Sequence, residues 1–107
     1  MPAGYVTLWE FSVEPSRQGE FESAYGPEGR WARLFSGAPG YLGTELLRDR
    51  AGGLRYVTID RWSSVEAWRE FKARFAAEYE RLDRECAALT THEAALGEYA
   101  PVGGTQG

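Results

Sequence analysis

The alternation of hydrophobic and polar positions divides the first third of the chain into a strand and a broken helix. Residues 5–13 are rich in β-branched and aromatic side chains and contain neither glycine nor proline, which predicts a strand. Pro15 then marks the start of a helix, because the first helical turn tolerates its missing N–H group. The stretch 26–29, Gly-Pro-Glu-Gly, must break that helix. Helical spacing resumes over residues 31–35, and glycine and proline at 36–40 end the element.

The rest of the chain predicts a hairpin, a long helix and a last strand. Two strand-like runs, 41–49 and 54–62, flank the short connection 50–53, which is typical of a β-hairpin with a four-residue loop. From about residue 64 to residue 89 hydrophobic residues recur every three or four positions. This pattern is one apolar stripe along a helix that is broken once at most. Residues 90–100 predict the last strand.

The long helix carries its own start signal and its own buried side. Ser63 with Glu66 three residues later forms a capping box, with Ser63 as the N-cap residue. The stripe places Phe71, Phe75 and Leu82 on the buried side. The exposed side is predicted to carry charged residues, namely Arg69, Arg74, Glu78 and Arg81.

The element order β-α-β-β-α-β predicts the fold class. It indicates an α+β protein of the ferredoxin-like type, a four-stranded antiparallel sheet with both helices on one face. Residues 1–100 are expected to form a single domain and residues 101–107 a flexible C-terminal tail. In the first strand Leu8 points to one face while Trp9 and Phe11 point to the other, so both faces are apolar. Two helices can cover only one face, and the other is expected to pack against a second copy of the chain in a homodimer.

Charge and composition exclude several classes of function. The chain has 12 Lys and Arg against 16 Asp and Glu, a net charge of −4, which argues against nucleic-acid binding. No apolar run approaches the ~20 residues that span a membrane, and no secretory signal is visible, so we expect no membrane partner and a cytoplasmic location. Cys86 is the single cysteine and cannot form an intrachain disulfide. One histidine and one cysteine do not offer the usual spacing of a metal site, and no glycine motif for dinucleotides or phosphates occurs. We therefore expect no metal and no cofactor, and any oxidation must take its electrons from the substrate.

Polar residues inside the third predicted strand are candidates for chemistry. By the two-residue period of a strand, Thr58, Asp60 and Trp62 share one side. A buried carboxylate is costly unless it is paired or lies near an opening. Asp60 is therefore expected either to line a cavity or to pair with an arginine, Arg61 or Arg48.

Histidine is the side chain that changes charge near neutral pH, and His92 is the only one in the chain. Asp60 and His92 are the candidate catalytic bases. Thr58 and Trp62 are candidate contacts of a flat aromatic ligand, since indole offers a face for stacking. The alternative for Trp62 is plain core packing, and for His92 an exposed or hydrogen-bonded position without a catalytic role; the residue pattern favours this alternative in both cases.

Three segments of the chain resemble the antibiotic biosynthesis monooxygenase family. They are Trp-Glu-Phe at 9–11, Ala-Pro-Gly-Tyr-Leu-Gly at 38–43 and the end of the third strand, residues 56–63. The resemblance covers roughly residues 5–99. It implies a dimeric α/β barrel built from two ferredoxin-like chains. It also implies cofactor-independent oxygenation of phenolic polyketides or quinols, while a related branch degrades haem.

The family resemblance also assigns roles by position. The family's strand-three tryptophan corresponds to Trp62 and lines a cavity in its relatives. The polyketide-oxidising members have an Asn four residues earlier, where this chain has Thr58, and a Tyr about six residues later, where it has Trp68. This correspondence makes Trp68 a further candidate for substrate binding, beside its place on the apolar stripe. A helix arginine of the family has Arg81 or Arg84 as its nearest counterpart.

The haem-degrading branch fits the chain less well. It uses a His where this chain has Lys72 and an Asn where it has Trp9, which argues against haem degradation. Two hypotheses from different classes remain. The protein is either a cofactor-independent monooxygenase acting on a phenolic or quinol small molecule, or a non-catalytic dimeric protein of the same fold that binds a small molecule or serves in a stress response. The departures at Thr58 and Trp68 favour the second hypothesis, whereas the family's tryptophan at Trp62 favours the first.

Overall fold

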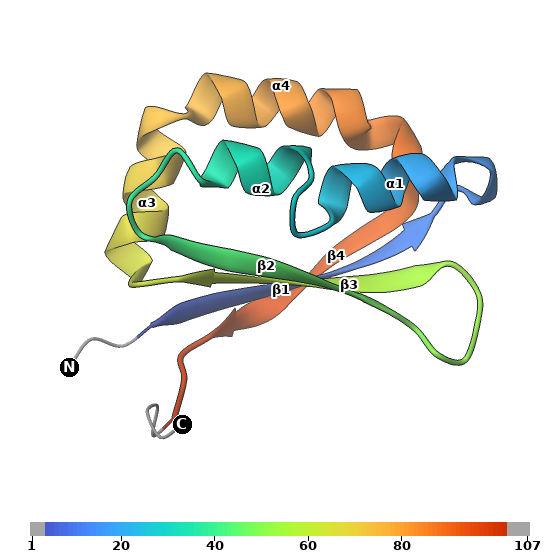
Figure 1. The fold of residues 1–107 in the computed structure, drawn as a ribbon, viewed down its shortest axis with the longest axis horizontal. Coiled ribbons are helices and arrows are strands. Elements are labelled where there is room, and N and C mark those ends of the chain that lie inside the picture. The colour runs from blue at the N-terminus through green and yellow to red at the C-terminus, as the bar shows by residue number, and fades with distance from the viewer. Residues whose placement is uncertain (1–3, 103–107) are drawn as a thin grey trace.

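The computed structural model describes residues 4–102 and confirms the ferredoxin-like α+β fold (Figure 1). All helices lie on one face of a four-stranded antiparallel sheet. The prediction of a tail at 101–107 falls mostly outside the described residues. The elements in chain order are β1 (Tyr5–Val13), the short 3-10 turn η1 (Pro15–Arg17), α1 (Gln18–Tyr25), α2 (Arg30–Phe35), β2 (Tyr41–Arg48), β3 (Arg55–Trp62), α3 (Val65–Arg74), α4 (Ala76–Cys86), the 3-10 turn η2 (Ala87–Leu89) and β4 (Thr90–Tyr99).

The sheet register brings polar residues from three strands together. The strand order is β2-β3-β1-β4, so β3 and β1 are central and β2 and β4 are edges. Thr7 of β1 lies opposite Asp60 of β3, and Trp9 lies opposite Thr58. On the other side of β3, Thr44 of β2 also lies opposite Asp60. Paired residues point to the same face of a sheet, and here that face is the one that the helices cover.

The first helical segment is broken where the sequence predicts. α1 ends at Tyr25 and α2 begins at Arg30, and Gly29 lies in the turn between them. A Cβ atom at Gly29 would lie 2.3 Å from the carbonyl oxygen of Ser23. The chain can therefore pass this close to the end of α1 only with a glycine at this position.

The second helical segment is also broken once, at Phe75, between α3 and α4. The prediction that Ser63 caps this segment was wrong by one residue. Ser64 is the N-cap, and its Oγ accepts a hydrogen bond from the backbone N–H of Ala67 at 3.1 Å. Ser64 has the extended backbone of an N-cap residue, with φ −164° and ψ 165°, whereas Ser63 lies one residue further out, where its backbone N–H donates to the carbonyl oxygen of Gly40 at 2.8 Å.

The predicted hairpin is present, with a longer connection than expected. β2 ends at Arg48 and β3 begins at Arg55, so residues 49–54 form the loop in place of residues 50–53. Gly52 and Gly53 have φ values of 99° and 73°, in the left-handed region that glycine adopts without strain. In the observed register Arg48 lies opposite Tyr56, which places Thr44 opposite Asp60 in the site.

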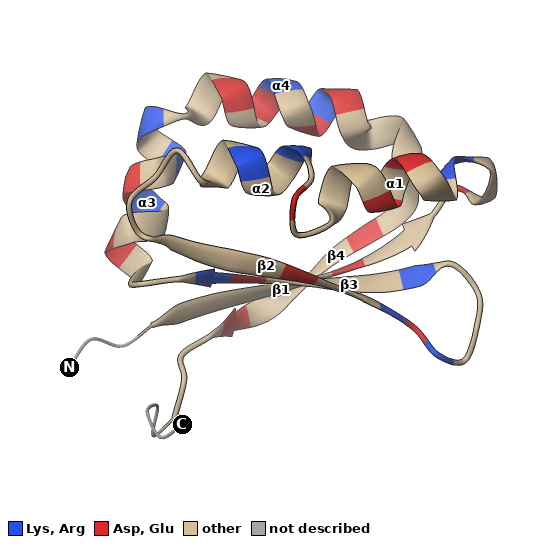
Figure 2. Cartoon of the chain, in the orientation of Figure 1, with Lys and Arg blue, Asp and Glu red and all other residues tan. Residues whose placement is uncertain are grey.

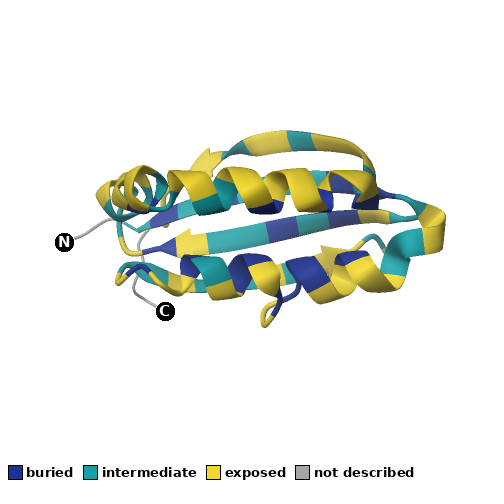
Figure 3. Ribbon diagram, turned by 90° about the horizontal axis from the view of Figure 1, so that it is seen from above, coloured by how far each residue is buried: buried dark blue, intermediate teal, exposed yellow. Residues whose placement is uncertain are grey.

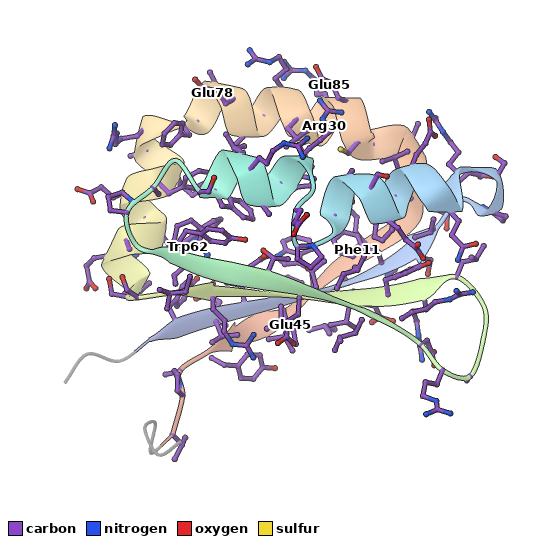
Figure 4. The ribbon with its side chains drawn as sticks, in the orientation of Figure 1. Phe11, Arg30, Glu45, Trp62, Glu78 and Glu85 are labelled. Carbon is purple, nitrogen blue, oxygen red and sulfur yellow. The ribbon has the colours of Figure 1, made fainter. Side chains whose placement is uncertain are left out.

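The core lies between the sheet and the helices, whose inward sides carry the buried residues (Figure 3). Phe11 of β1 packs against Phe21 and Tyr25 of α1, with ring centroids 5.4 and 4.9 Å apart. Figure 4 shows Phe11 and Trp62 both pointing from the sheet toward the helices. Burial of these rings supplies much of the hydrophobic stabilisation of so small a domain.

The buried side of α3 and α4 is largely as predicted. Phe71 and Leu82 are buried, but Phe75 is only half-buried, because the break between the helices turns it toward the exposed Gly37. On the outer side acidic and basic residues are interspersed along both helices (Figure 2). No helix within residues 4–102 has the length and apolar character needed to cross a membrane. Of the residues predicted to be exposed, Arg69, Arg74 and Arg81 are so, and Glu78 is half-buried.

The second face of the sheet, which we call the open face, has no helix over it (Figure 1). Its centre is apolar and half-buried, formed by Leu8, Val57 and Ile59. Toward the edge Arg61 and Glu45 form an ion pair at 3.2 Å, and Figure 4 shows Glu45 pointing away from the helices. The prediction that both faces of the strands carry apolar residues is therefore confirmed.

Candidate functional site

A cavity of about 470 Å³ lies between the helix-covered face of the sheet and the helices. The volume is within the range of small-molecule sites. Aromatic rings form most of its walls: Tyr5, Trp9 and Phe11 from β1, Tyr25 from α1, Trp31 and Phe35 from α2, Trp68 from α3 and Tyr79 from α4. Such a lining favours a flat apolar or aromatic ligand.

The sheet side of the cavity, which we call the floor, is polar. Thr7, Thr44, Thr58 and Asp60 come from three neighbouring strands and all line the cavity. Thr7 and Thr58 are buried, so their hydroxyl groups lie deep beneath the helices. A polar floor beneath aromatic walls can orient a ring that carries oxygen substituents.

Asp60 is the carboxylate of the floor. Its Oδ1 accepts a hydrogen bond from the hydroxyl of Thr44 at 2.5 Å, which leaves Oδ2 as the oxygen available to a ligand. Burial raises the pKa of Asp60 to about 6, while the hydrogen bond from Thr44 acts in the opposite direction. A carboxyl group with this pKa is ionised at neutral pH and is a stronger base than an ordinary aspartate. Of the two environments predicted for Asp60, the structure shows the cavity, since Arg61 pairs with Glu45 on the open face.

The helix side of the cavity, which we call the roof, carries a cation on aromatic rings. The Nζ atom of Lys72 lies 4.1 Å from the ring centroid of Tyr79 and 5.3 Å from that of Trp68. Burial, with smaller contributions from nearby carboxylates, raises the pKa of Tyr79 to about 12. Tyr79 therefore keeps its proton over the physiological range and can act as a hydrogen-bond donor.

The β4 side of the cavity is acidic. Glu93 and Glu98 of β4 and Asp83 of α4 line it. The pKa of Glu93 is raised, mainly by burial and next by the charge of Asp83. The cavity therefore has one end with carboxylates and a roof with one ammonium group, Lys72.

Three of the five candidate residues meet at the cavity. Thr58, Asp60 and Trp68 all line it. Trp62 is 1% exposed and is not among the lining residues. It lies behind Trp68, with ring centroids 5.3 Å apart, and belongs to the core.

His92 lies away from Asp60. It is exposed and pairs with Ser12, so it points to the open face, whereas its neighbour Glu93 lines the cavity. The structure therefore brings Asp60 to the cavity as a base and leaves His92 outside it.

Sequence reasoning missed Thr44, Lys72 and Tyr79 as parts of the site. Tyr79 stands on the apolar stripe of the helix and looked like a core residue. Lys72 directly follows the buried Phe71. It is the only lysine of the chain, and this is the one feature of the sequence that could have pointed to it. The face to which Thr44 points depends on the hairpin register, and the predicted four-residue loop gives a register that differs from the observed one.

Comparison with known proteins assigns the family. The sequence profile of the family described as Antibiotic biosynthesis monooxygenase matches residues 5–77, and the chain belongs to this family. No sequence among the curated proteins matches significantly.

Solved structures show the same fold. A variant of SnoaB, a cofactor-independent oxygenase from Streptomyces nogalater, is 28% identical, with 92% of both chains covered and a TM-score of 0.70. A proposed antibiotic biosynthesis monooxygenase from Nitrosomonas europaea is 18% identical, with 98% of this chain and 96% of the other covered and a TM-score of 0.75. Rv0793 from Mycobacterium tuberculosis is 16% identical, with 92% and 95% covered and a TM-score of 0.67.

Proposed function

We propose that this protein is a cofactor-independent monooxygenase that acts on a phenolic or quinol ring bound in the cavity. The observation that carries the proposal is Asp60, a carboxyl group with a pKa of about 6, at the floor of an aromatic-walled cavity. Removal of a phenolic proton is the step that such a base can perform. The resulting electron-rich anion can react with dioxygen directly.

In the proposed reaction the ring lies between the floor and the roof. Oδ2 of Asp60 takes the proton of a ring hydroxyl, and the hydroxyl of Thr58 contacts a second oxygen of the ring. Trp68 stacks on the ring, and the ammonium group of Lys72 offsets the negative charge that forms. The anion then reduces dioxygen. One oxygen atom becomes bonded to a ring carbon, the other leaves as water, and the ring supplies all the electrons, so that a hydroquinone yields a hydroxyquinone. The aromatic walls of the cavity limit water around the anion.

The likeness to SnoaB supports this proposal. SnoaB is named a cofactor-independent oxygenase, and its variant is 28% identical to this chain over 92% of both chains. The departures at Thr58 and Trp68 imply that a hydroxyl group and an indole take the places of an amide and a phenol. We therefore assign the proton transfer to Asp60, which the cavity geometry supports, and assign no step to His92.

We also propose that the protein is a homodimer that pairs through the open face. Leu8, Val57 and Ile59 form an apolar centre there, and the exposed Leu47 and Leu96 extend the apolar surface. Soluble monomers rarely leave an apolar surface of this kind without a cover. The cavity lies on the other side of the sheet, so one chain supplies all the residues of the site described above.

Oxygen uptake tests the proposed function. The protein is mixed with a panel of hydroquinones and anthrones in air-saturated buffer, without added metal, flavin or nicotinamide. We expect uptake with at least one compound and a loss of ~100-fold or more with Asp60→Asn. Glu80→Gln, which removes an exposed carboxylate of α4, is the matched control and should keep the wild-type rate. Uptake that survives Asp60→Asn would contradict the site. Binding of these compounds with no uptake for any of them would favour the non-catalytic hypothesis.

A further inference from the structure

We propose that Thr44 and Tyr41 are positioning residues that hold Asp60 in its orientation for proton abstraction. The inference rests on the proposed function and extends it to two residues that act through Asp60. It is carried by a chain of two hydrogen bonds. The hydroxyl groups of Tyr41 and Thr44 are 2.5 Å apart, and the hydroxyl of Thr44 is 2.5 Å from Oδ1 of Asp60.

The direction of these hydrogen bonds follows from the number of protons. A threonine hydroxyl has a single proton, and in this chain Thr44 donates it to the carboxylate of Asp60. Tyr41 must therefore be the donor in the hydrogen bond to Thr44. Burial raises the pKa of Tyr41 above the usual value of a tyrosine, so it stays protonated and remains a donor at neutral pH. Both hydroxyl groups are thus aligned toward the ionised form of Asp60.

This alignment selects the reactive oxygen. A carboxylate whose two oxygens are both free can rotate and present either one. Here Thr44 engages Oδ1, which leaves Oδ2 as the proton acceptor for a ligand in the cavity that Asp60 lines. If a proton settled on Oδ1 instead, Thr44 would have to turn its own proton toward Tyr41, and the whole chain would reverse. The arrangement therefore favours protonation at Oδ2, where the ligand is bound.

The surrounding structure fixes the far end of the chain. Tyr41 begins the edge strand β2, and its ring packs between Phe35 and Trp62, with centroids 5.5 and 5.3 Å away. Trp62, which does not line the cavity, thereby supports the site indirectly through Tyr41. The backbone pairing of Thr44 with Asp60 fixes the middle of the chain.

Other titratable and charged groups face the cavity, with no hydrogen bond to Asp60 among the described residues. They stay in place in every variant below, so a difference between variants reports on the chain of hydroxyl groups. These groups are Tyr5 of β1, Tyr25 of α1, Lys72 of α3, Tyr79 and Asp83 of α4, and Glu93 and Glu98 of β4.

The test is a titration of Asp60 in the ligand-free protein, followed by the carboxyl carbon signal in NMR and assigned by its loss in Asp60→Asn. Thr44→Val keeps the shape of the side chain and removes the donor, and we expect the titration to move to higher pH. Tyr41→Phe should move it in the same direction by a smaller amount, and Thr44→Ser should restore the wild-type titration. Thr7→Val is the matched control. Thr7 faces Asp60 from the other neighbouring strand without a hydrogen bond to it, so this titration should not move.

Activity supplies a second readout. A tenfold loss in the acid dissociation constant of Asp60 cuts its ionised fraction at pH 6 about fivefold and changes little at pH 9. The rate of oxygen uptake by Thr44→Val should follow that pattern. An unchanged titration in Thr44→Val would overturn the proposal, whatever the activity. A shifted titration in a protein that consumes no oxygen would uphold the positioning role and reject the proposed function.

Discussion

Asp60 is a carboxyl group in surroundings that disfavour its charge. It lies beneath the helices with one hydrogen-bond donor, Thr44, and burial raises its pKa to about 6. A neutral side chain of the same size would be more stable there at neutral pH. Residues of this kind are frequent in functional sites, where reactivity is retained at a cost in stability.

This cost is measurable as a pH-dependent difference between the wild type and Asp60→Asn. Because the pKa of Asp60 is higher in the folded protein than the usual 3.8, the folded state binds more protons between about pH 4 and pH 6. Its contribution to stability is therefore full below about pH 4 and is lost as the pH rises through 6. The rise in the pKa of Asp60 from 3.8 to about 6 corresponds to about 3 kcal/mol in the free energy of unfolding. Urea melts at pH 4 and pH 8 should show Asp60→Asn gaining stability relative to the wild type by about 2–3 kcal/mol between the two. A difference that is the same at both pH values would mean that Asp60 titrates normally.

At the level of the elements, the sequence predicts the order and the faces of the strands correctly but not the hairpin register. A connection at 50–53 pairs Thr44 with Ile59 and points it to the open face. In the structure Arg48 lies opposite Tyr56, one residue further along β3 than that connection predicts, which pairs Thr44 with Asp60 and points it into the cavity. A shift of one residue reverses every side chain of a strand, so an error of this size hides a residue of the site. Composition cannot resolve it, since Gly52 and Gly53 are compatible with several loop lengths.

The helices show a similar limit. The apolar stripe places Phe71 and Leu82 correctly because their burial follows from helical spacing alone. Phe75 stands where α3 gives way to α4, and a break changes the phase of the helix at that point. Tyr79 lies on the same stripe, yet it lines the cavity. A stripe predicts which residues turn inward and does not predict whether the interior there is filled.

The half-buried position of Phe75 predicts a ranking of stabilities. Phe71 is 1% exposed and contacts Trp62, Trp68 and Phe75, so Phe71→Ala should cost about 3–5 kcal/mol in the free energy of unfolding. Phe75→Ala should cost about half as much, because part of the Phe75 side chain is already in contact with water. Arg81→Ala on the exposed side should change stability by less than about 0.5 kcal/mol. Urea melts that rank Phe75→Ala above Phe71→Ala would contradict this packing.

The turn between α1 and α2 predicts opposite effects for two glycine substitutions. Gly29→Ala forces a Cβ atom against the backbone of Ser23 and should destabilise the protein by about 1–3 kcal/mol. Gly19→Ala is the matched control. Gly19 lies in α1 with no atom within 4 Å of its added Cβ, so alanine there should stabilise by about 0.5–1 kcal/mol. Thermal melts of the two variants measure both effects, and a neutral Gly29→Ala would mean that the turn is not tightly packed.

For the whole molecule, one layer of helices over one sheet leaves the open face without a cover (Figure 1). The Arg30–Glu85 ion pair joins α2 to α4, and Figure 4 shows both residues on the helix side of the sheet. The open face instead offers its apolar centre for pairing. In the proposed arrangement the helix-covered face of the sheet holds the site, and the open face pairs with a second copy of the chain.

The proposed homodimer predicts a mass of about two chains in light scattering at micromolar concentration. Ile59→Asp places a charge at the centre of the open face and should yield monomers. Ala77→Asp, at an exposed position of α4, is the matched control and should remain dimeric. A wild-type protein that is a stable monomer over this concentration range would contradict the pairing through the open face.

The most direct test of the central claim is the dependence of kcat/KM for oxygen uptake on pH, compared between the wild type and Asp60→Asn. If Asp60 takes the proton from the bound ring, the wild type should gain activity as the pH rises, with a midpoint near 6. Phenols themselves ionise near pH 10, so this midpoint belongs to the protein and not to the substrate. Asp60→Asn should lack the rise near pH 6 and be slower by about 100-fold or more at pH 7. Profiles with the same midpoint in both proteins would contradict the account.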